Sequence, residues 1–589
     1  MAPDADRTFF VPRHSGRNIL PCSPLFNRLL RHAGRRPNAC AIRDDRAGYE
    51  KTYLQLLSDV LSIREELRQT LGPEIVRALD NDEEVYIAVL AAGSYEFTVA
   101  MLGAMALGAA VVPLTVVLPV EEAAYFIRKS EAAAVLVQSS VLKLGTALQE
   151  LMVSTTDPSF RSIPIQNSID ACPLQISDIL ISTNPYLSEN APGVVIFTSG
   201  TTGPPKGSVM RRAFVSDNAQ ATADHYHITE EDVILHILPV HHATGMGIMF
   251  FPFLISGACI EFRAGGFDEV WMWDRWREGV RNPAKRITFF SGVPTIFMRM
   301  RRHYQRYLSK LPPAELSEYI AAARQFRAVL CGTSALPQPI SQFWTSLMKE
   351  RIVQRYGATE FGAVFKVHLG DKDVPEGSVG ELTPGLDLKL SEGDEGEVLV
   401  KSPYMFSKYL RDPAATAKAH DASGYYKTGD IARKEGKYYF IMGRASLDII
   451  KSGGYKISAL DIEREILGLP YVSEVMVVGV PDEEFGQRVA ALIGLQEEQI
   501  TDEFLSTHGS NEHVLTINDL RRDLRSRLAG YKLPTLLRVV EGELPKTATG
   551  KVMKKILGPK FFPEDYDDVK EVQVWRAPSK VEKVIAAKL

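Results

Sequence analysis

The sequence of 589 residues contains few cysteines and no uninterrupted membrane-length apolar run. Its five cysteines are scattered and none forms a C-x-x-C pair, so the sequence predicts neither a disulfide framework nor a cysteine zinc site. This usage fits a reducing compartment. The apolar stretch that begins at Ala100 is broken by Pro113 and Pro119. A buried helix, a turn and a buried strand explain it better than a membrane span.

The chain also lacks a surplus of charge. Its formal net charge of −4 includes no basic excess that would recruit nucleic acid. The first residues have no apolar signal core, and their mixture of acidic and basic side chains gives little support for a transit peptide. The final tripeptide, Ala587 to Leu589, is one conservative step from the peroxisomal address Ser-Lys-Leu. We therefore expect a peroxisomal location, with cytoplasmic and mitochondrial locations as alternatives.

The order of apolar segments predicts the fold class. A chain of this length is too long for one core, so two or more domains are expected. From residue 85, strand-like and helix-like segments alternate, which is typical of α/β units with a parallel sheet. From about residue 375, Gly-rich turns separate short strands. We predict an α/β N-terminal domain over 1–444 that includes a small β region, a small α+β domain over 445–560, and a polar tail over 561–589.

A loop rich in glycine and hydroxyl residues, FTSGTTGPPKGS, follows the apolar run GVVI. It does not match the common phosphate loop G-x-x-x-x-G-K-[ST]. Backbone N–H groups freed by glycine, together with Thr and Ser hydroxyls, can nevertheless line an anion, and a lysine adds charge. For this loop taken alone, a Gly-rich surface turn is the alternative. The residues expected to bind phosphate are Thr198, Ser199, Gly200, Thr201, Thr202, Gly203 and Lys206.

A second motif, RYGATEFG, follows a strand-like segment and carries three candidate ligands for a nucleotide. Tyr356 can stack on a base and Thr359 can donate a hydrogen bond to phosphate. Glu360 can hold a magnesium ion through oxygen, the ligand type that this cation prefers.

Two later motifs add complementary groups. YYKTGD ends in Asp430, whose carboxylate can accept two ribose hydroxyls, and Arg444 of the next Gly-Arg pair supplies a further donor. In LPKTATGK, Lys551 lies in a glycine-flanked loop. A lysine placed in this way can reach a phosphate and the oxygen beside it that develops negative charge.

Five ordered motifs, TSGTTGPPKGS, YGATE, YKTGD, GR…IIKSGGYKIS and PKTATGK, resemble the acyl-adenylate-forming superfamily over residues 85–555. Its members include acyl-CoA synthetases, luciferases and the adenylation domains of peptide synthetases. The resemblance implies that an acid and ATP form an acyl-AMP and pyrophosphate, after which a thiol, usually that of coenzyme A, displaces AMP. ATP, Mg²⁺ and coenzyme A are therefore expected. Further nucleotide contacts are expected at Gly332, Thr333, Ser334, Gly357 and Ala358.

The resemblance also implies that the small C-terminal domain is mobile and rotates between the two half-reactions. Lys551 would then serve adenylation, whereas Lys451 with the Gly453-Gly454-Tyr455 loop would serve thioester formation. A solvated loop lysine is the alternative interpretation of Lys451. The sequence departs from the usual hinge spacing G-R-x-x-D, because GRASLD places Asp448 one residue late. The role of Asp448 as the hinge therefore stays open.

Two polar side chains favour a dicarboxylic substrate. His242 in LPVHHATG and Arg299 in GVPTIFMRM occupy segments that flank the acyl pocket in the family, and these segments resemble the malonyl-CoA synthetase branch. A buried second carboxylate needs such partners. We predict malonate or methylmalonate, with His242 and Arg299 on the distal carboxylate and His242 grouped with the catalytic residues. Alternatively, Arg299 begins the exposed basic run RMRRHYQRY and His242 only packs.

Other activities remain open at this stage. The chain can instead adenylate a medium-chain or other acid, or load its acyl group onto a separate carrier protein. A luciferase-type oxygenase has no positive support. A non-catalytic relative is disfavoured by retention of the candidate ligands Lys206, Glu360, Asp430, Arg444 and Lys551.

Overall fold

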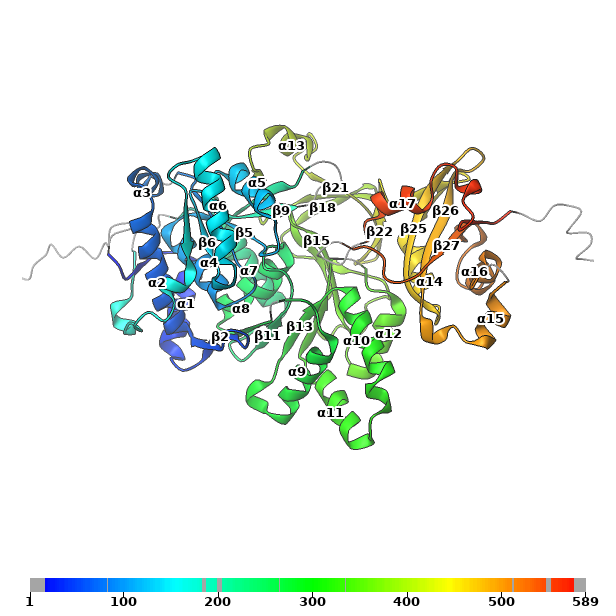
Figure 1. Ribbon diagram of the computed structural model, residues 1–589, viewed down its shortest axis with the longest axis horizontal. Helices are drawn as coiled ribbons and strands as arrows, with labels where there is room; N and C mark the ends of the chain where they lie inside the picture. The colour runs from blue at the N-terminus through cyan, green and yellow to red at the C-terminus, as the bar shows by residue number, and fades with distance from the viewer. Residues whose placement is uncertain are drawn as a thin grey trace, which may run out of the picture.

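The computed structural model describes residues 16–81, 83–182, 187–198, 204–263, 265–333, 335–510, 513–546 and 552–576. Figure 1 shows a larger region, coloured blue to olive, beside a smaller region, coloured yellow to red. This division matches the expected α/β fold with a large N-terminal and a small C-terminal domain, which is confirmed. No helix in the described ranges is both long and apolar enough to cross a membrane.

The first large sheet has seven strands and carries the Gly-rich loop. In spatial order they are β20 (Lys408–Tyr409), β10 (Lys206–Arg211), β9 (Pro192–Thr198), β5 (Ala110–Leu114), β4 (Tyr86–Leu90), β6 (Ala134–Val137) and β7 (Arg161–Pro164). Strands β4, β5 and β6 are parallel, as their continuous apolar runs predict. Strands β9 and β10 pair antiparallel on either side of the loop, with Thr198 opposite Lys206.

The second large sheet joins a parallel half to an antiparallel half at β15. Its order is β18 (Asp387–Glu392), β19 (Glu395–Lys401), β21 (Tyr426–Glu435), β22 (Tyr438–Arg444), β17 (Gly380–Leu382), β16 (Gly362–Lys366), β15 (Val353–Ala358), β14 (Ala328–Cys331), β13 (Phe289–Gly292), β11 (Val233–His236), β12 (Cys259–Phe262), β2 (Cys40–Asp44) and β3 (Tyr49–Thr52). Strand β15 pairs parallel with β14 and antiparallel with β16. The YGATE motif therefore lies where the pairing direction reverses.

Helices cover these sheets according to their apolar patterns. Helix α4 (Tyr95–Leu107) is apolar all round and buried along its whole length, and it contacts α2 (Tyr53–Thr70). It begins at a Ser94 cap and ends at Gly108, whose φ of 100° favours glycine. The other helices of the larger region are α1 (Pro24–Arg35), α3 (Pro73–Asp80), α5 (Val120–Ser130), α6 (Leu142–Thr155), α7 (Asp217–His225), α8 (Phe251–Ser256), α9 (Glu269–Arg281), α10 (Pro294–Arg306), α11 (Pro313–Ala323), α12 (Gln338–Met348) and α13 (Pro413–Lys418).

The smaller region has its own apolar core and a four-stranded sheet. The hairpin β23 (Ile449–Ser452) and β24 (Tyr455–Ser458) leads into α14 (Ala459–Leu467). The sheet contains β25 (Val472–Asp482), β26 (Gly486–Leu495), β27 (Leu536–Val540) and β28 (Gln573–Val574), with helices α15 (Asp502–His508), α16 (Ile517–Leu524) and α17 (Lys554–Phe561). Ile450 and Ile457 of the hairpin join this core, so the hairpin packs with the smaller region.

The segment expected to be a polar tail begins with packed structure. Phe562, Tyr566 and Val572 are buried against the C-terminal sheet, and β28 pairs with β27. Apolar residues spaced singly among charged ones are sufficient for this packing, although they form no periodic sequence pattern. Residues 577–589, which include the tripeptide Ala587 to Leu589, lie outside the described residues.

Candidate functional site

The reversal at β15 brings three of the predicted nucleotide ligands into contact. The hydroxyl of Tyr356 donates to Asp430 Oδ2 at 2.7 Å, and Arg444 Nε donates to Asp430 Oδ1 at 2.9 Å. Asp430 on β21 and Arg444 on β22 are register partners, whereas Tyr356 comes from the neighbouring half of the sheet. A carboxylate has about four acceptor positions, so Asp430 retains capacity for ribose hydroxyls.

A second group connects the Gly-rich hairpin to the YGATE motif through a tyrosine. The Tyr409 hydroxyl donates to Glu360 Oε1 at 3.0 Å, and the Lys206 ammonium lies 5.2 Å from the Tyr409 ring centroid. Tyr409 also bonds the hydroxyl of Tyr426 at 3.1 Å. Burial and the nearby Glu360 raise the pKa of Tyr409, so it stays a neutral donor. The expected phosphate lysine and magnesium ligand are thus brought together. Sequence reasoning missed Tyr409 and Tyr426, although Tyr426 lies within the YYKTGD motif.

The other predicted nucleotide residues that the structure describes lie at or just beyond the ends of strands in the two large sheets. Thr198 Oγ1 donates to the Lys206 carbonyl at 3.3 Å. Gly357 and Ala358 end β15, and Thr359 follows in the turn. Thr333 adopts a φ of 77° directly after Gly332, an uncommon conformation that concentrates at ligand sites. The remaining expected contacts at Ser199, Gly200, Thr201, Thr202, Gly203 and Ser334, and the expected catalytic Lys551, lie outside the described residues.

These residues fit a nucleotide with its magnesium ion. In the described ranges, no carboxylate forms an ion pair with Lys206, so its charge is available to phosphate. No group of three or more His, Cys, Asp or Glu that could cage a metal occurs there either. Magnesium commonly binds through one or two carboxylates together with substrate phosphates. Glu360 alone therefore suits magnesium carried by ATP.

The lysine expected to serve thioester formation lies away from this group. Lys451 is exposed on β23, and its backbone N–H donates to Gln487 Oε1 at 2.8 Å. Gly453 and Gly454 form the hairpin turn with φ values of 56° and 85°, which glycine adopts without strain. Tyr455 stacks on Tyr531 with ring centroids 4.3 Å apart. In the described structure, Lys451 makes no contact with Tyr356, Asp430 or Arg444.

Asp448 bridges the two regions of the chain. Its Oδ2 accepts the backbone N–H of Arg444 at 3.0 Å, and its Oδ1 accepts Lys554 Nζ at 2.6 Å. Lys554 also pairs with Glu463 at 2.8 Å. Burial alone would lower the pKa of Lys554, but the carboxylates of Glu463 and Asp448 raise it. The late aspartate in GRASLD is therefore an ion-pair partner at the junction.

The two residues expected to bind a distal carboxylate have different partners in the described structure. Arg299 donates to Glu269 Oε2 at 2.6 Å, and its guanidinium lies over the Phe267 ring at 5.1 Å. Its side chain is 41% exposed. The half-buried His242 stacks on His241 with ring centroids 4.3 Å apart. Burial and the adjacent His242 lower the pKa of His241 to about 3. Arg299 is thus partly neutralised by a carboxylate from α9.

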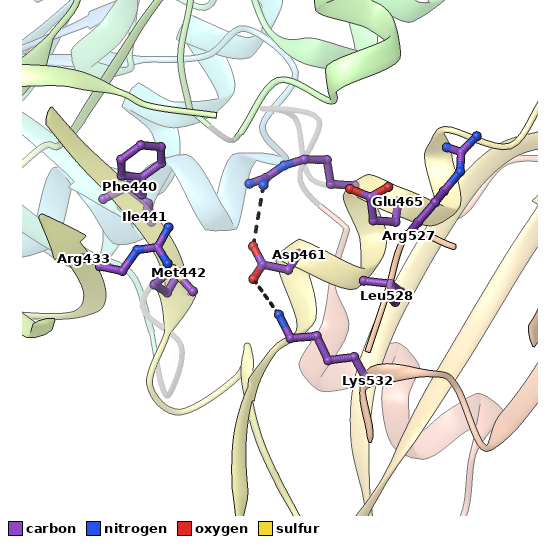
Figure 2. A pocket seen from close by; sticks show the side chains of 10 residues that line it. Arg433, Phe440, Ile441, Met442, Asp461, Glu465, Arg527, Leu528 and Lys532 are labelled. Carbon is purple, nitrogen blue, oxygen red and sulfur yellow. Dashed lines mark hydrogen bonds and ion pairs between the residues drawn. The ribbon is translucent and has the colours of Figure 1, made fainter. Parts of the chain in front are cut away.

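Two clefts on the surface contain none of these predicted residues. One of about 220 Å³ separates β21 and β22 from α14 and the segment 527–532, and Figure 2 shows the Asp461 carboxylate pointing to Lys532 within it. Asp461 pairs loosely with Arg464 at 3.6 Å and with Lys532 at 3.5 Å. The other cleft, of about 730 Å³, lies between α12 and the segment 369–376. The first cleft follows the junction between the two regions.

Comparison with known proteins identifies the class. Residues 29–410 match the AMP-binding enzyme family, and residues 461–551 match the AMP-binding enzyme C-terminal domain. The chain belongs to the AMP-binding enzyme family. A probable CoA ligase from Humulus lupulus is 32% identical over 94% of this chain and 94% of the relative. A malonate–CoA ligase from Arabidopsis thaliana is 33% identical over 80% of this chain and 77% of the relative.

Further comparisons give the same architecture. A mitochondrial malonate–CoA ligase from Homo sapiens is 29% identical over 94% of this chain and 96% of the relative. A malonyl-CoA ligase solved with methylmalonyl-CoA and AMP is 26% identical, with a TM-score of 0.56 over 86% of this chain and 97% of that chain. ATP-bound MatB from Rhodopseudomonas palustris, at 22% identity, shares the fold with a TM-score of 0.73 over 92% of this chain and 99% of that chain.

These findings confirm the resemblance to acyl-adenylate-forming enzymes and its malonyl-CoA synthetase branch, and the class of AMP-forming acid–CoA ligase. They also confirm ATP and coenzyme A as cosubstrates. The expected peroxisomal location is wrong, because the relatives from Homo sapiens, Mus musculus and Xenopus laevis are named as mitochondrial. A three-residue likeness with one substitution carries too little information to outweigh relatives that match most of the chain.

Proposed function

We propose that this protein is a malonate–CoA ligase that also accepts methylmalonate. The observation that carries the adenylating activity is the contact of Tyr356, Asp430 and Arg444 across the reversal at β15. The choice of acid is supported by the malonate–CoA ligases among the relatives and by the methylmalonyl-CoA in the solved complex.

In the proposed adenylation step, Asp430 and Arg444 hold the ribose, and Lys206 with Thr198 neutralises and orients the phosphates. Glu360, kept in place by the Tyr409 hydroxyl, would hold the magnesium ion that ATP carries. The acid's carboxylate oxygen attacks the α-phosphorus, the new P–O bond forms, and pyrophosphate leaves with the electrons of the broken bond. Positioning and charge neutralisation supply the rate enhancement, because no covalent enzyme intermediate is needed.

In the proposed transfer step, the thiolate of coenzyme A attacks the carbonyl carbon of the acyl-AMP and AMP leaves. Lys451 and the Gly453-Gly454-Tyr455 hairpin would serve this step, and Lys551 would serve the first. The exposed position of Lys451 supports a movement of the smaller region between the steps, with Asp448 at the junction as the hinge.

The activity can be tested by measuring pyrophosphate release with malonate, methylmalonate, butyrate and hexanoate, each with and without coenzyme A. We expect malonate to be preferred over butyrate, with thioester formed only when coenzyme A is added. A site that pairs a substrate's polar group can reject an analogue without that group by roughly 10⁴–10⁵ in favourable cases. A preference for hexanoate would contradict the dicarboxylate assignment. Transfer of the acyl group to a purified carrier protein, but not to coenzyme A, would contradict the proposal that coenzyme A is the acceptor.

We also propose a mitochondrial location, supported by the names of the vertebrate relatives. The full chain carrying a C-terminal fluorescent protein should coincide with a mitochondrial marker in cells. A diffuse cytosolic signal would contradict this proposal.

A further inference from the structure

Two cysteines lie side by side where β2 and β12 begin. The Cys259 thiol donates to the Cys40 sulfur at 3.5 Å, although the two residues are 219 positions apart in the chain. Two sulfurs in a disulfide are about 2.05 Å apart, so bond formation requires each sulfur to move by less than about 1 Å. Cys259 is buried, whereas Cys40 is partly exposed. Solvent can therefore reach one thiol, and the other is shielded beside it.

A bulge in β2 explains why these side chains meet. The register of β2 with β12 is regular from Ile42 onward, and a regular strand would turn the side chain of Cys40 away from that of Cys259. Against its other neighbour, β3, the register of β2 shifts between Cys40 and Ile42, so β2 has one extra residue there. Bulges of this kind re-aim a side chain. The bulge brings Cys40 to the face of the sheet that carries Cys259.

The surroundings of the pair favour the thiolate of Cys40. Arg43 lies on the same face, because its register partner is Glu261, two residues after Cys259, and it donates to Glu261 at 2.8 Å. The hydrogen bond from Cys259 and the Arg43 charge lower the pKa of Cys40, although burial opposes them. The same hydrogen bond and burial raise the pKa of Cys259. Because the thiolate is the nucleophilic form, oxidation is expected to begin at Cys40.

The other three cysteines differ from this pair. Cys172 is exposed, Cys22 is partly exposed and Cys331 is buried, and burial raises the pKa of Cys331 to about 12. The described ranges include all five cysteines, and within them none of these three forms a hydrogen bond to another cysteine. They serve as internal controls for the pair.

The pair lies away from the proposed nucleotide contacts. Cys40 and Cys259 are the first residues of β2 and β12, whereas Ala358 ends β15 and Thr333 follows β14. These four strands run parallel in one sheet, through β11 and β13. The thiols therefore lie at the edge of the sheet opposite to the site that adenylates the acid, and the adenylation chemistry does not account for them.

We propose that Cys40 and Cys259 form a modification site for hydroperoxides, at which the two thiols convert reversibly into a disulfide that ties β2 to β12. The Cys40 thiolate attacks one oxygen of hydrogen peroxide, the O–O bond breaks, and the departing hydroxide takes a proton to form water. The Cys259 sulfur then attacks the sulfenic acid of Cys40 and the S–O bond breaks. The hydroxyl group leaves as water with the Cys259 proton. Two electrons pass from the thiols to the peroxide, and a dithiol reductant reverses the change.

Peptide mapping of the full chain tests the site. Reduced protein is treated with a small excess of hydrogen peroxide and then unfolded, its free thiols are blocked with N-ethylmaleimide, and the digest is analysed by mass spectrometry. We expect a cross-linked peptide pair that contains Cys40 and Cys259, which dithiothreitol should separate. Cys172→Ser, at the exposed cysteine, is the matched control and should form the same cross-link. Oxidation confined to Cys172 or Cys22, with both thiols of the pair still blocked by maleimide, would overturn the proposal.

Two variants separate the roles of the thiols. Cys259→Ala should stop at the sulfenic acid of Cys40, which dimedone captures as a stable adduct. Cys40→Ser should leave the buried Cys259 unreacted under the same treatment. The absence of an adduct in Cys259→Ala, or oxidation of Cys259 in Cys40→Ser, would refute the assignment of Cys40 as the thiol that peroxide attacks.

Thermal unfolding without reductant gives an independent measurement. A bond between residues 219 positions apart restrains the unfolded chain over a long loop, which stabilises the folded state. Treatment with peroxide should therefore raise the Tm of the unmodified protein by at least about 2 °C and leave that of Cys40→Ser unchanged. A lowered Tm in the treated unmodified protein, or an equal shift in Cys40→Ser, would contradict the proposed disulfide.

Discussion

At the scale of single residues, Lys366 gives the stability of the protein a distinctive pH dependence. Its pKa is lowered to about 8 by burial and by the Arg355 charge, from the usual lysine value of 10.5. The unfolded chain therefore binds more protons than the folded chain between these two values, and stability rises with pH across this interval. The rise attributable to this lysine is ~3 kcal/mol, complete near pH 10.5 and absent below pH 8.

The groups around Lys366 do not produce the same signal. Arg355 stays charged throughout, and the pKa of His225 is about 4. Burial raises the pKa of Tyr226, and burial raises that of Cys331 to about 12. Urea unfolding at pH 7.5 and pH 10 should therefore show that the free energy of unfolding rises with pH more in the unmodified protein than in Lys366→Met. Identical pH dependence in the two proteins would mean that Lys366 is not held in this environment.

A second residue-scale prediction concerns Asp430. Asp430→Ala should lower pyrophosphate release by roughly 10²–10³, because it removes a positioned group that we propose contacts the nucleotide and leaves Arg444 without its carboxylate. Tyr356→Phe keeps the ring and removes only the hydroxyl that donates to Asp430, so its loss should be smaller, about tenfold. Steady-state kinetics at saturating acid check both. Equal losses would assign the main role to the tyrosine hydroxyl.

At the scale of elements, Lys554 ties α17 to the junction. Lys554→Met should destabilise the protein by about 3–5 kcal/mol, because it leaves the Glu463 and Asp448 carboxylates without their shared cation. Lys560→Met, at an exposed position of the same helix, is the control and should change stability by less than about 0.5 kcal/mol. Denaturant unfolding measures both. An unchanged stability for Lys554→Met would show that the carboxylates find other partners.

The elements also show what sequence reasoning can and cannot reach. Strands β4, β5 and β6 were predictable because continuous apolar runs bounded by turns are typical of a parallel sheet. The sequence motifs identified Tyr356, Asp430 and Arg444 as candidate ligands. They did not show that these three side chains contact one another. The pairing of Arg299 with Glu269 was not predictable, because it depends on how α9 and α10 pack. Arg355 lies opposite Lys366 because of the register between β15 and β16, and the sequence does not determine that register.

At the scale of the whole molecule, the two half-reactions should depend on different lysines. The proposed transfer lysine, Lys451, is exposed on β23 and away from Asp430, whereas the proposed adenylation lysine, Lys551, lies outside the described residues. We propose that the two regions take a different arrangement for each lysine. The proposed hinge is Asp448, which bonds both Arg444 and Lys554 at the junction.

Lys551→Ala should therefore abolish acyl-AMP formation, with a loss of roughly 10²–10³ in rate, and spare thioester formation from supplied malonyl-AMP. Lys451→Ala should show the opposite pattern, with pyrophosphate release intact and transfer to coenzyme A lost. Single-turnover measurements of each half-reaction separate the two variants without relying on the overall rate. A variant that loses both half-reactions equally would contradict the alternation of domains, whereas normal thioester formation by Lys451→Ala would remove the hairpin from the mechanism. Lys554 pairs with Asp448 at the junction. Repeating the assay with Lys554→Met asks whether this ion pair sets the balance between the two proposed arrangements.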